Sequence, residues 1–552
     1  MDEPVSSQAA NDWVARTADD VCAEADRRHP GEVITCASGI SPSGPIHLGN
    51  LREIMVPHLV ADELARRGVP SRHILSWDDY DRLRKVPAGV PPSYAEQIGR
   101  PLTAVPDPCG EHESWAEHFK AGLRDALTEL GVNLVEVSQT QMYTSGAYLA
   151  QIETAMRRRT EIHDVLDRYR TKRDANADED DERRTDLAYY PFRPYCRVCG
   201  RDDTTVTAFD DETTDLTYRC ACGAVDGPRP LAEVTGKLVW KVDWPMRWAH
   251  ERATFEAAGV DHSSPGSSFT VGSHLVRDIY GGEPPHYLMY SFVGTSGSAK
   301  MSGSKGGAPT PADALRVLEA PLLRWLYARR RPNQSITIAF DQEVNRTYDE
   351  WDALTRRVAA GKANPVDTAA HARAARTANG PVRATPRPLP FRALASVADI
   401  TAGETSQVIR ILRDLTPDDP ITSLDQARPR LDCAQAWINE HVAPEDRTQV
   451  RTEPDVETLR SLTDSEQHAL KLLLDGLADN WSIEKLTTLL YGIPKIQRGL
   501  PLDTPPTPEL KTAQRTWFIL LYRLLVADDT GPRLPTLLLA LGPDRVRSLL
   551  TA

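Results

Sequence analysis

Residues 32–68, "EVITCASGISPSGPIHLGNLREIMVPHLVADELARRG", contain the pattern that decides the fold. The first nine are mostly apolar and β-branched, which indicates a buried strand. A loop of small residues at 41–45 follows, and apolar residues then recur with helical spacing until Gly68, a typical helix end. A second apolar stretch, 71–77, comes directly afterwards. This order of strand, loop, helix and strand predicts a βαβ unit with parallel strands.

Three further stretches are apolar enough to be strands of the same sheet, namely residues 132–138, 267–272 and 286–294. Together with the βαβ unit they predict an α/β fold with a Rossmann-type parallel sheet. Ligands of such sheets bind at the carboxyl ends of the strands. The loop at 41–45 therefore marks the predicted site.

The bulk composition narrows the class of protein. A chain of 552 residues is too long for one hydrophobic core and predicts several domains. Its N-terminal residues are polar and acidic, unlike a signal peptide, and no apolar run is long enough to span a bilayer. Eight cysteines do not make a disulfide scaffold in a chain of this length. We therefore expect a cytoplasmic protein without a membrane partner, and a monomer by default.

Net charge leaves the question of a nucleic-acid partner open. The formal charge of −13 provides no general attraction to a polyanion. Binding requires only a local basic face, however, and the arginine-rich stretches 156–173 and 322–332 provide two candidates. Each stretch, taken alone, is more typical of a solvated helix surface.

Composition also divides the chain into segments. The charged stretch 174–185 indicates a linker without a core, and the proline-rich stretch 379–391 precedes long helical patterns without strand signals. We expect a first catalytic half at 1–175, a cysteine-bearing insertion at 176–235, a second catalytic half at 236–332, a helical connector at 333–390 and an all-α domain at 391–552.

Four cysteines of the insertion have the spacing of a metal site. They form the pattern C-x2-C-x20-C-x-C, and two close pairs of thiolates suit tetrahedral structural zinc. The second pair is tighter than the usual spacing, so a replaced ligand remains open. Zinc would also staple a polar segment that has little core of its own. The predicted ligands are Cys196, Cys199, Cys220 and Cys222, whereas Cys22, Cys36, Cys109 and Cys433 are expected to be buried thiols.

The stretch "SPSGPIHLGN" at 41–50 has the composition of a phosphate site. Small residues let the backbone approach a ligand, and the helix that follows presents N–H groups and a positive dipole end. His47 and Asn50 are three residues apart on one helix face, so both side chains can meet the same anion. Gly49 leaves room between them for a base or a ribose. Taken alone, the loop is more typical of an ordinary turn that caps a helix.

A second stretch, "KMSGSKGG" at 300–307, removes much of that ambiguity. It is rich in glycine and serine, follows a predicted strand and contains Lys300 and Lys305. Flexible ammonium groups are suited to following negative charge as pyrophosphate leaves. Two phosphate-binding elements this far apart fit a nucleotide held between two halves of a split fold.

"HLGN" and "KMSGS" resemble the two signatures of class I aminoacyl-tRNA synthetases. One departure is Gly303, which stands where the general pattern of the second signature has a lysine, so the lysine that takes this role remains open. The chain is similar to class I lysyl-tRNA synthetases in particular, strongly from about residue 10 to 360 and more loosely beyond. The segments that carry this resemblance are 76–87, 105–119, 260–268 and 322–333.

This resemblance implies ATP-dependent attachment of L-lysine to lysine tRNA through a lysyl-adenylate, with Mg²⁺ assisting. It implies an anticodon-binding role for the helical domain at 391–552 and a place for the zinc insertion near the tRNA acceptor end. It assigns catalytic contacts with the phosphates to His47, Asn50, Lys300 and Lys305. The implied ATP-binding set is Pro42, Ser43, Gly44, His47, Gly49, Asn50, Lys300, Met301, Ser302, Ser304 and Lys305.

Recognition of lysine requires an anion for the ammonium group and an apolar sleeve for the methylenes. Asp78, Asp79 and Asp81 follow the strand at 71–77 and are candidates for the anion, although helix capping and ion pairing would also explain them.

The resemblance adds two aromatic residues to this pocket, Trp240 and His262. It also implies that the backbone of Ser38 and Gly39 receives the α-amino end of the substrate. A core position remains an alternative for Trp240, because other tryptophans lie close to it in the sequence.

A fainter group of metal-ligating residues occurs in "DPCGEHESWAEHF" at 107–119. Histidine and carboxylate ligands suit zinc, and the resemblance favours a second site. Without the resemblance, this stretch is an exposed helix N-terminus. The candidate ligands are Asp107, Glu111, His112 and His118.

Two other functions remain open. One is a paralogue that activates lysine or an analogue for a non-tRNA acceptor, although such an activator would not need the helical C-terminal domain. The other is a non-catalytic, zinc-containing RNA-binding protein, which would have no use for two phosphate-binding elements.

Overall fold

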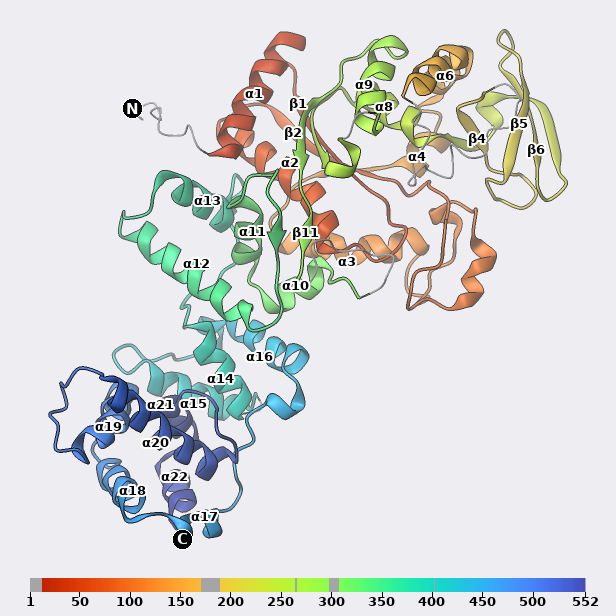
Figure 1. Cartoon of the computed structure of the whole chain (residues 1–552). Coiled ribbons are helices and arrows are strands. Elements are labelled where there is room, and N and C mark those ends of the chain that lie inside the picture. The colour runs from red at the N-terminus through yellow and green to blue at the C-terminus, as the bar shows by residue number, and fades with distance from the viewer. Residues whose placement is uncertain (1–11, 170–188, 264–265, 297–306, 402, 552) are drawn as a thin grey trace. The chain divides into compact units, whose positions relative to one another are not determined.

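The computed structural model describes residues 12–169, 189–263, 266–296, 307–401 and 403–551. The chain forms two compact units (Figure 1). The first comprises Met1–Leu315, Ala320–Ala339 and Leu354–Arg383, and the second Arg316–Glu319, Phe340–Ala353 and Ala384–Ala552. Across the described residues, the structure has no helix whose length and apolarity would let it cross a membrane.

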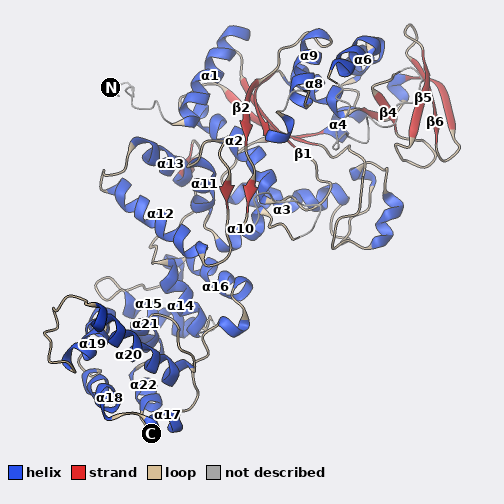
Figure 2. Cartoon of the chain, in the orientation of Figure 1, coloured by secondary structure: helices blue, strands red, loops and turns tan. Residues whose placement is uncertain are grey.

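A five-stranded parallel sheet is the centre of the first unit (Figure 2). The βαβ unit expected at 32–77 is confirmed, with the helix α2 (Leu48–Arg66) connecting two neighbouring parallel strands. In spatial order the strands are β10 (His286–Tyr290), β9 (Ala253–Gly259), β1 (Ile34–Ile40), β2 (Ser71–Trp77) and β3 (Val135–Ser138).

The central strand β1 is buried on both faces, which explains why its sequence is uncharged and mostly apolar. Cys36 faces a cluster formed with α1 (Trp13–Arg28) and α2, whereas Ala37 faces a cluster formed with α8 (Trp240–Glu251) and α9 (Ser268–Asp278). Successive residues of a strand point to opposite faces, so β1 anchors both helical layers at once.

The prediction of a strand at 267–272 is wrong, because these residues begin the helix α9. A six-residue window is too short to separate the two periods. Over the longer segment, the buried residues Val271, Leu275 and Val276 recur with helical spacing and pack toward α8. At 286–294 the expected strand ends at Tyr290, and a short strand β11 (Val293–Gly294) follows.

The cysteine-bearing insertion forms a small antiparallel structure of its own. Phe192, Leu216 and Tyr218 belong to a hydrophobic cluster that the insertion shares with α8 and α9. The charged stretch 174–185 lies outside the described residues. The strands of the insertion are β4 (Phe192–Pro194), β5 (Thr204–Phe209), β6 (Asp215–Cys220) and β7 (Val225–Pro230). The helices α3 (Trp115–Glu129), α4 (Gln139–Thr144), α5 (Leu149–Arg157) and α6 (Arg159–Arg168) precede the insertion, and the strand β8 (Gly236–Leu238) follows it.

A buried arginine ties α2 to a part of the chain distant in sequence. The guanidinium of Arg52 donates to the backbone carbonyls of Ser291 (2.8 Å), Pro332 (2.9 Å) and Gln334 (2.8 Å). These acceptors lie before and after the predicted second signature at 300–305, so α2 is attached to both flanks of that segment. Other elements of this region are α10 (Pro311–Val317), α11 (Ala320–Ala328), β12 (Ile336–Thr337), α12 (Glu343–Ala359), α13 (Pro365–Ala375), β13 (Arg376–Thr377) and β14 (Gly380–Pro381).

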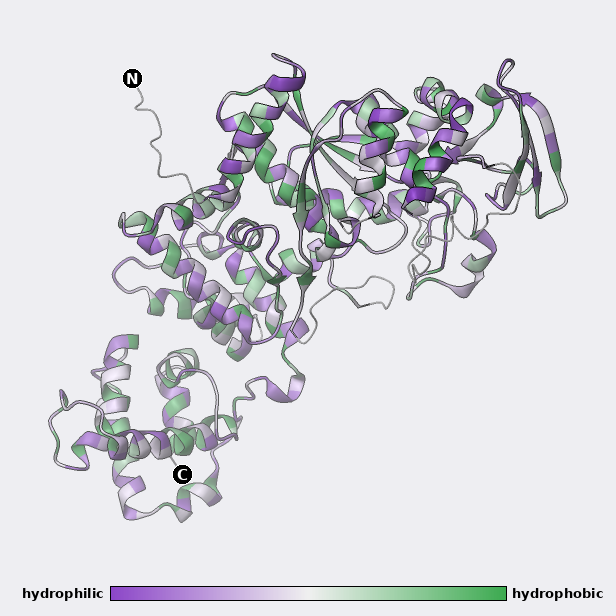
Figure 3. Cartoon of the chain, turned by 45° about the horizontal axis from the view of Figure 1, so that its top comes forward, coloured by the Kyte–Doolittle hydropathy of each residue, from purple (hydrophilic) through white to green (hydrophobic). Residues whose placement is uncertain are grey.

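From residue 391 onward the second unit is built of helices, as expected. Apolar and polar residues alternate around these helices (Figure 3), and leucines such as Leu473, Leu490, Leu521 and Leu537 form the core. The helices are α14 (Phe391–Thr401), α15 (Thr405–Leu415), α16 (Arg430–His441), α17 (Val456–Ser461), α18 (Asp464–Gly476), α19 (Ile483–Ile496), α20 (Pro508–Val526), α21 (Leu534–Leu541) and α22 (Pro543–Leu550).

Candidate active site

A pocket of about 620 Å³ opens at the carboxyl ends of β1, β2, β9 and β10, at the place the βαβ pattern predicts. The second signature, with Lys300, Met301, Ser302, Ser304 and Lys305, lies outside the described residues. Pro42, Gly49 and Asp79 are not among the lining residues. The predicted residues that line the pocket are Ser38, Gly39, Ser43, Gly44, His47, Asn50, Asp78, Asp81, Trp240 and His262.

His47 and Asn50 form a capping box at the start of α2. The Nδ1 atom of His47 accepts from the backbone N–H of Gly49 (3.0 Å), and the side-chain oxygen of Asn50 accepts from the backbone N–H of His47 (3.2 Å). The sequence of this loop leaves a helix cap and a phosphate site as alternatives. In the structure the two are compatible, because the residues that cap the helix also line the pocket.

The capping box determines which atoms these two side chains offer to a ligand. Because Nδ1 of His47 accepts a hydrogen bond, the neutral imidazole carries its proton on Nε2. Because Oδ1 of Asn50 is the accepting atom of the amide, its NH₂ group is the donating end. Both side chains therefore present N–H donors next to a helix N-terminus, which is an arrangement suited to phosphate oxygens.

Asp78 and Asp79 have different surroundings. Asp78 lines the pocket but is engaged by two cations, Arg247 and Lys237 (3.6 Å). Asp79 is fully buried and bound to Lys120 at 2.7 Å, and it also accepts from Ser138 Oγ at 2.7 Å. Asp79 therefore has a structural ion pair rather than a place in the pocket.

Aromatic side chains form one wall of the pocket. Trp240 stacks on Trp244 with ring centroids 5.2 Å apart, and His262 contacts Trp244 edge-on at 5.7 Å. The indole N–H groups of Trp244 and Trp248 both donate to Glu256, whose carboxylate is thereby occupied. Burial raises the pKa of Glu256 to about 7.

Glu53 is a pocket residue that the sequence analysis missed. It accepts from the hydroxyl of Tyr290 and from the backbone N–H of Gly39, and no ion pair with a described cation offsets its charge. Burial, together with the nearby Glu256 and Asp261, raises the pKa of Glu53 to about 8. This part of the pocket therefore favours the arrival of a cation.

The signal for Glu53 is present in the sequence. In "HLGNLRE", the residues His47, Asn50 and Glu53 are each three apart, so they lie along one face of the first turns of α2. The aspartates after β2 also supply carboxylates, so residue type alone does not single out Glu53.

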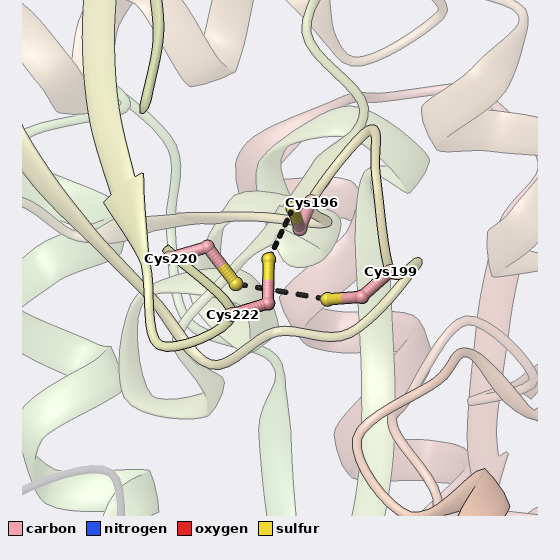
Figure 4. Close-up of side chains that lie close together, drawn as sticks. All are labelled: Cys196, Cys199, Cys220 and Cys222. Atoms are coloured by element: carbon pink, nitrogen blue, oxygen red, sulfur yellow. Dashed lines mark hydrogen bonds between the residues drawn. The ribbon is translucent and has the colours of Figure 1, made fainter. Parts of the chain in front are cut away.

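Cys196, Cys199, Cys220 and Cys222 converge as expected (Figure 4). The Sγ atoms of Cys196 and Cys222 are 3.8 Å apart, and those of Cys199 and Cys220 are 3.6 Å apart. Four thiolates bound tetrahedrally at a zinc–sulfur distance of about 2.3 Å are separated by about 3.8 Å. The donor set and its spacing therefore fit one zinc ion.

The second candidate metal group differs from the expected one by a single residue. Asp107, His112 and His118 converge, but the fourth member is Cys109 rather than Glu111. The Sγ atom of Cys109 lies 3.4 Å from Nδ1 of His112 and 3.3 Å from Nδ1 of His118. The expectation of a buried, uninvolved thiol at Cys109 is therefore wrong, since this cysteine is exposed and belongs to the group.

Known proteins are similar to this chain over nearly its full length. Residues 11–380 match the family described as tRNA synthetases class I (K). A lysine–tRNA ligase of Streptomyces coelicolor is 59% identical over 99% of this chain and 100% of its own. One of Thermococcus kodakarensis is 33% identical over 97% of this chain and 98% of its own. A solved glutamate tRNA ligase of Elizabethkingia meningosepticum has a TM-score of 0.41 at 12% identity, over 94% of this chain and 98% of that one. The chain belongs to the class I (K) family of tRNA synthetases.

Proposed function

We propose that this protein attaches L-lysine to lysine tRNA at the expense of ATP. The observation that carries the proposal is the full-length identity of 59% with a lysine–tRNA ligase. In the first step the carboxylate of lysine attacks the α-phosphorus of ATP, which gives lysyl-adenylate and releases pyrophosphate. In the second step a terminal ribose hydroxyl of the tRNA attacks the activated carbonyl, which releases AMP. We expect the reaction in the cytoplasm, where its product is used.

We assign the nucleotide to the start of α2. Neither step requires a protein nucleophile, so positioning and charge stabilisation supply the acceleration. His47 Nε2 and the Asn50 amide donate to phosphate oxygens, and the loop at 41–45 gives the backbone close access. Mg²⁺ bound with the nucleotide would neutralise part of the phosphate charge, and Lys300 and Lys305 are proposed to follow the leaving pyrophosphate.

We assign the ammonium group of lysine to Glu53. Asp78 already faces Arg247 and Lys237, and Glu256 is occupied by two indole N–H groups. Glu53 has a tyrosine hydroxyl and a backbone N–H as partners but no cation among the described residues. A buried carboxylate gains most from a cation when no other charge compensates it.

The rest of the lysine molecule then lies along the aromatic wall of the pocket. Trp240 and His262 provide the apolar surface for the methylenes, and Ser38 and Gly39 at the end of β1 meet the α-amino end.

Lysine binding should depend on pH because Glu53 must lose its proton. The pKa of Glu53 is raised to about 8 in the empty pocket, and an ammonium group lowers it again. Binding therefore releases a proton below pH 8, and affinity falls by up to about tenfold for each pH unit below that value. Isothermal titration of lysine from pH 6.5 to 8.5, in buffers of different ionisation heat, measures both effects. A pH-independent affinity would contradict the assignment.

We propose zinc at both candidate metal groups, with a structural role. The purified protein is then expected to contain two zinc ions for each chain by elemental analysis. Replacing Cys196 with alanine should remove one ion and replacing His118 with alanine the other, because each change removes one of four ligands. Neither residue lines the active-site pocket, so His47 and Asn50 should keep their arrangement. An unchanged zinc content in either variant would contradict that site.

The function itself is tested with radiolabelled lysine and ATP, with and without lysine tRNA. Acid-precipitable label is expected only when ATP and lysine tRNA are both present. Transfer of ornithine or glutamate in place of lysine would overturn the assignment of the pocket. Lysine activation followed by transfer to another acceptor would overturn the assignment of the tRNA.

A further inference from the structure

The active-site pocket is also lined by a basic segment that the proposed function leaves unassigned. This segment, residues 82–85 or "RLRK", contributes Arg82, Arg84 and Lys85 to the lining. The one other arginine or lysine among the described lining residues is Arg247, which is paired with Asp78. Carboxylates line the same pocket, so a polyanionic ligand needs cations close to the place where it binds. The chain supplies most of these cations from this one segment.

The basic segment lies next to the loop that we assign to the phosphates. Gly44 of that loop faces Pro87, since a β-carbon placed on Gly44 would lie 3.5 Å from Cγ of Pro87. Lys85 precedes Pro87 by two residues, and Gly44, Lys85 and Pro87 all line the same pocket. A ligand that contacts the loop at 41–45 therefore lies beside the segment that carries Lys85.

The start of the basic segment is held firmly by the rest of the fold. Leu83 is fully buried, and its backbone N–H donates to the carbonyl of Arg100 (2.8 Å). Arg82 is paired with Asp202, with 3.2 Å between Nε and the carboxylate oxygen. The residues that follow thus extend from an anchored backbone. A contact made by Lys85 then costs mainly the ordering of its own side chain.

Lys85 has no anionic partner among the residues that the structure describes. No ion pair or hydrogen bond joins its ammonium group to any of them, and the residue is exposed at the pocket. Arg82 and Arg247 differ in this respect, because each is paired with a carboxylate. An ammonium group on a flexible stem can adjust its position to phosphate oxygens. The pocket therefore has an uncompensated positive charge beside the loop at 41–45.

We propose that Lys85 binds the triphosphate of ATP. The donors at the start of α2, the imidazole of His47 and the amide of Asn50, are neutral groups when they cap the helix. A hydrogen bond from a cation to a phosphate oxygen is stronger than one from a neutral donor. Lys85 supplies this charged donor from the neighbouring segment. The proposal rests on the proposed function only in identifying the polyanion as ATP.

The variant Lys85→Met tests the proposal, because it keeps the length of the side chain and removes its charge. Isothermal titration of the full chain with ATP, without lysine or tRNA, should give a dissociation constant about tenfold above that of the wild type. The dissociation constant of adenosine, which has no phosphate, should be unchanged. Lys85→Arg keeps a cation and should recover most of the affinity for ATP. Lys362→Met is the matched control, because Lys362 is also exposed but lies outside the pocket.

Kinetics and salt dependence provide two further measurements. In the charging reaction, Lys85→Met should raise the KM for ATP by about tenfold and leave the KM for lysine unchanged, because lysine is assigned to other residues of the pocket. The difference in ATP affinity between Lys85→Met and the wild type should shrink as potassium chloride is added, since salt screens the interaction of an exposed charge. Thermal unfolding should not distinguish the variants, because Lys85 is exposed.

Equal affinity of Lys85→Met and the wild type for ATP, or an equal loss of affinity for ATP and adenosine, would overturn the proposal. A higher KM for lysine tRNA with an unchanged KM for ATP would also overturn it and assign the charge to a phosphate of the tRNA. Titration with ATP requires no aminoacyl transfer, so a failure of the proposed function is separable. In that case the wild-type protein would bind ATP through Lys85 without charging lysine tRNA.

Discussion

Replacing Glu53 with glutamine is expected to raise the KM for lysine by about two orders of magnitude. Glutamine preserves the shape of the side chain and its bond with Tyr290, but it leaves the ammonium group of lysine without a charged partner. Loss of one member of a desolvated charge pair costs about 2–5 kcal/mol. Steady-state aminoacylation at varied lysine concentration measures the effect, and the KM for ATP should remain close to that of the wild type.

The pH profile distinguishes this role from a general structural effect. In Glu53→Gln the dependence of lysine affinity on pH below 8 should disappear, because the group that releases the proton is gone. Glu129→Gln is a suitable control, since burial also raises the pKa of Glu129 although it lies outside the pocket. A wild-type KM for lysine in Glu53→Gln would contradict this assignment and leave Asp78 as the candidate anion.

Replacing His47 should separate the helix cap from the contact with phosphate. Both His47→Ser and His47→Ala remove the donor at Nε2 and are expected to lower the rate of adenylate formation by about 10²–10³-fold. Serine is a favourable N-cap residue, whereas alanine is not, so only the alanine variant should lose about 1 kcal/mol of stability. Pyrophosphate exchange in the presence of lysine tRNA gives the rate, and thermal unfolding gives the stability.

If His47→Ser were as active as the wild type, the proposed phosphate contact would be contradicted and His47 would have only a capping role. The Asn50→Ala variant provides the complementary measurement, because it removes the amide NH₂ group assigned to the phosphates together with the Oδ1 atom that accepts from His47. Its KM for lysine should stay near the wild-type value, since Asn50 is assigned to the nucleotide.

The local pattern at 32–77 was sufficient to predict the centre of the fold. Strand, loop and helix each have their own period or composition here, and β1 and β2 pair in register from Ile34↔Ser71 to Ile40↔Trp77. The four cysteines of the insertion were equally predictable, because zinc restricts both the ligand type and the spacing. In contrast, the six residues at 267–272 have no distinctive period, and tertiary packing on α8 makes them helical.

The lysine pocket was less predictable because charge alone does not identify a binding residue. Asp78 and Asp79 have the residue type that an ammonium group requires, yet each is engaged by a protein cation. Glu53 lies on a helix whose sequence indicates a phosphate site. That no cation of the described residues pairs with Glu53 is a property of the packed structure. Cys109 joins Asp107 and His112 for the same reason, since chain folding and not spacing selects it over Glu111.

The order of strands in the sheet has a consequence for the synthesis of the chain on the ribosome. β1 and β2 emerge early, but β1 must wait for Ala253–Gly259 before its other edge is paired. Arg52 can donate to the carbonyl of Gln334 only after Gln334 has left the exit tunnel, which is later still. Throughout this interval the nascent polypeptide displays an unpaired, apolar strand edge, which makes it a substrate for chaperones and vulnerable to aggregation.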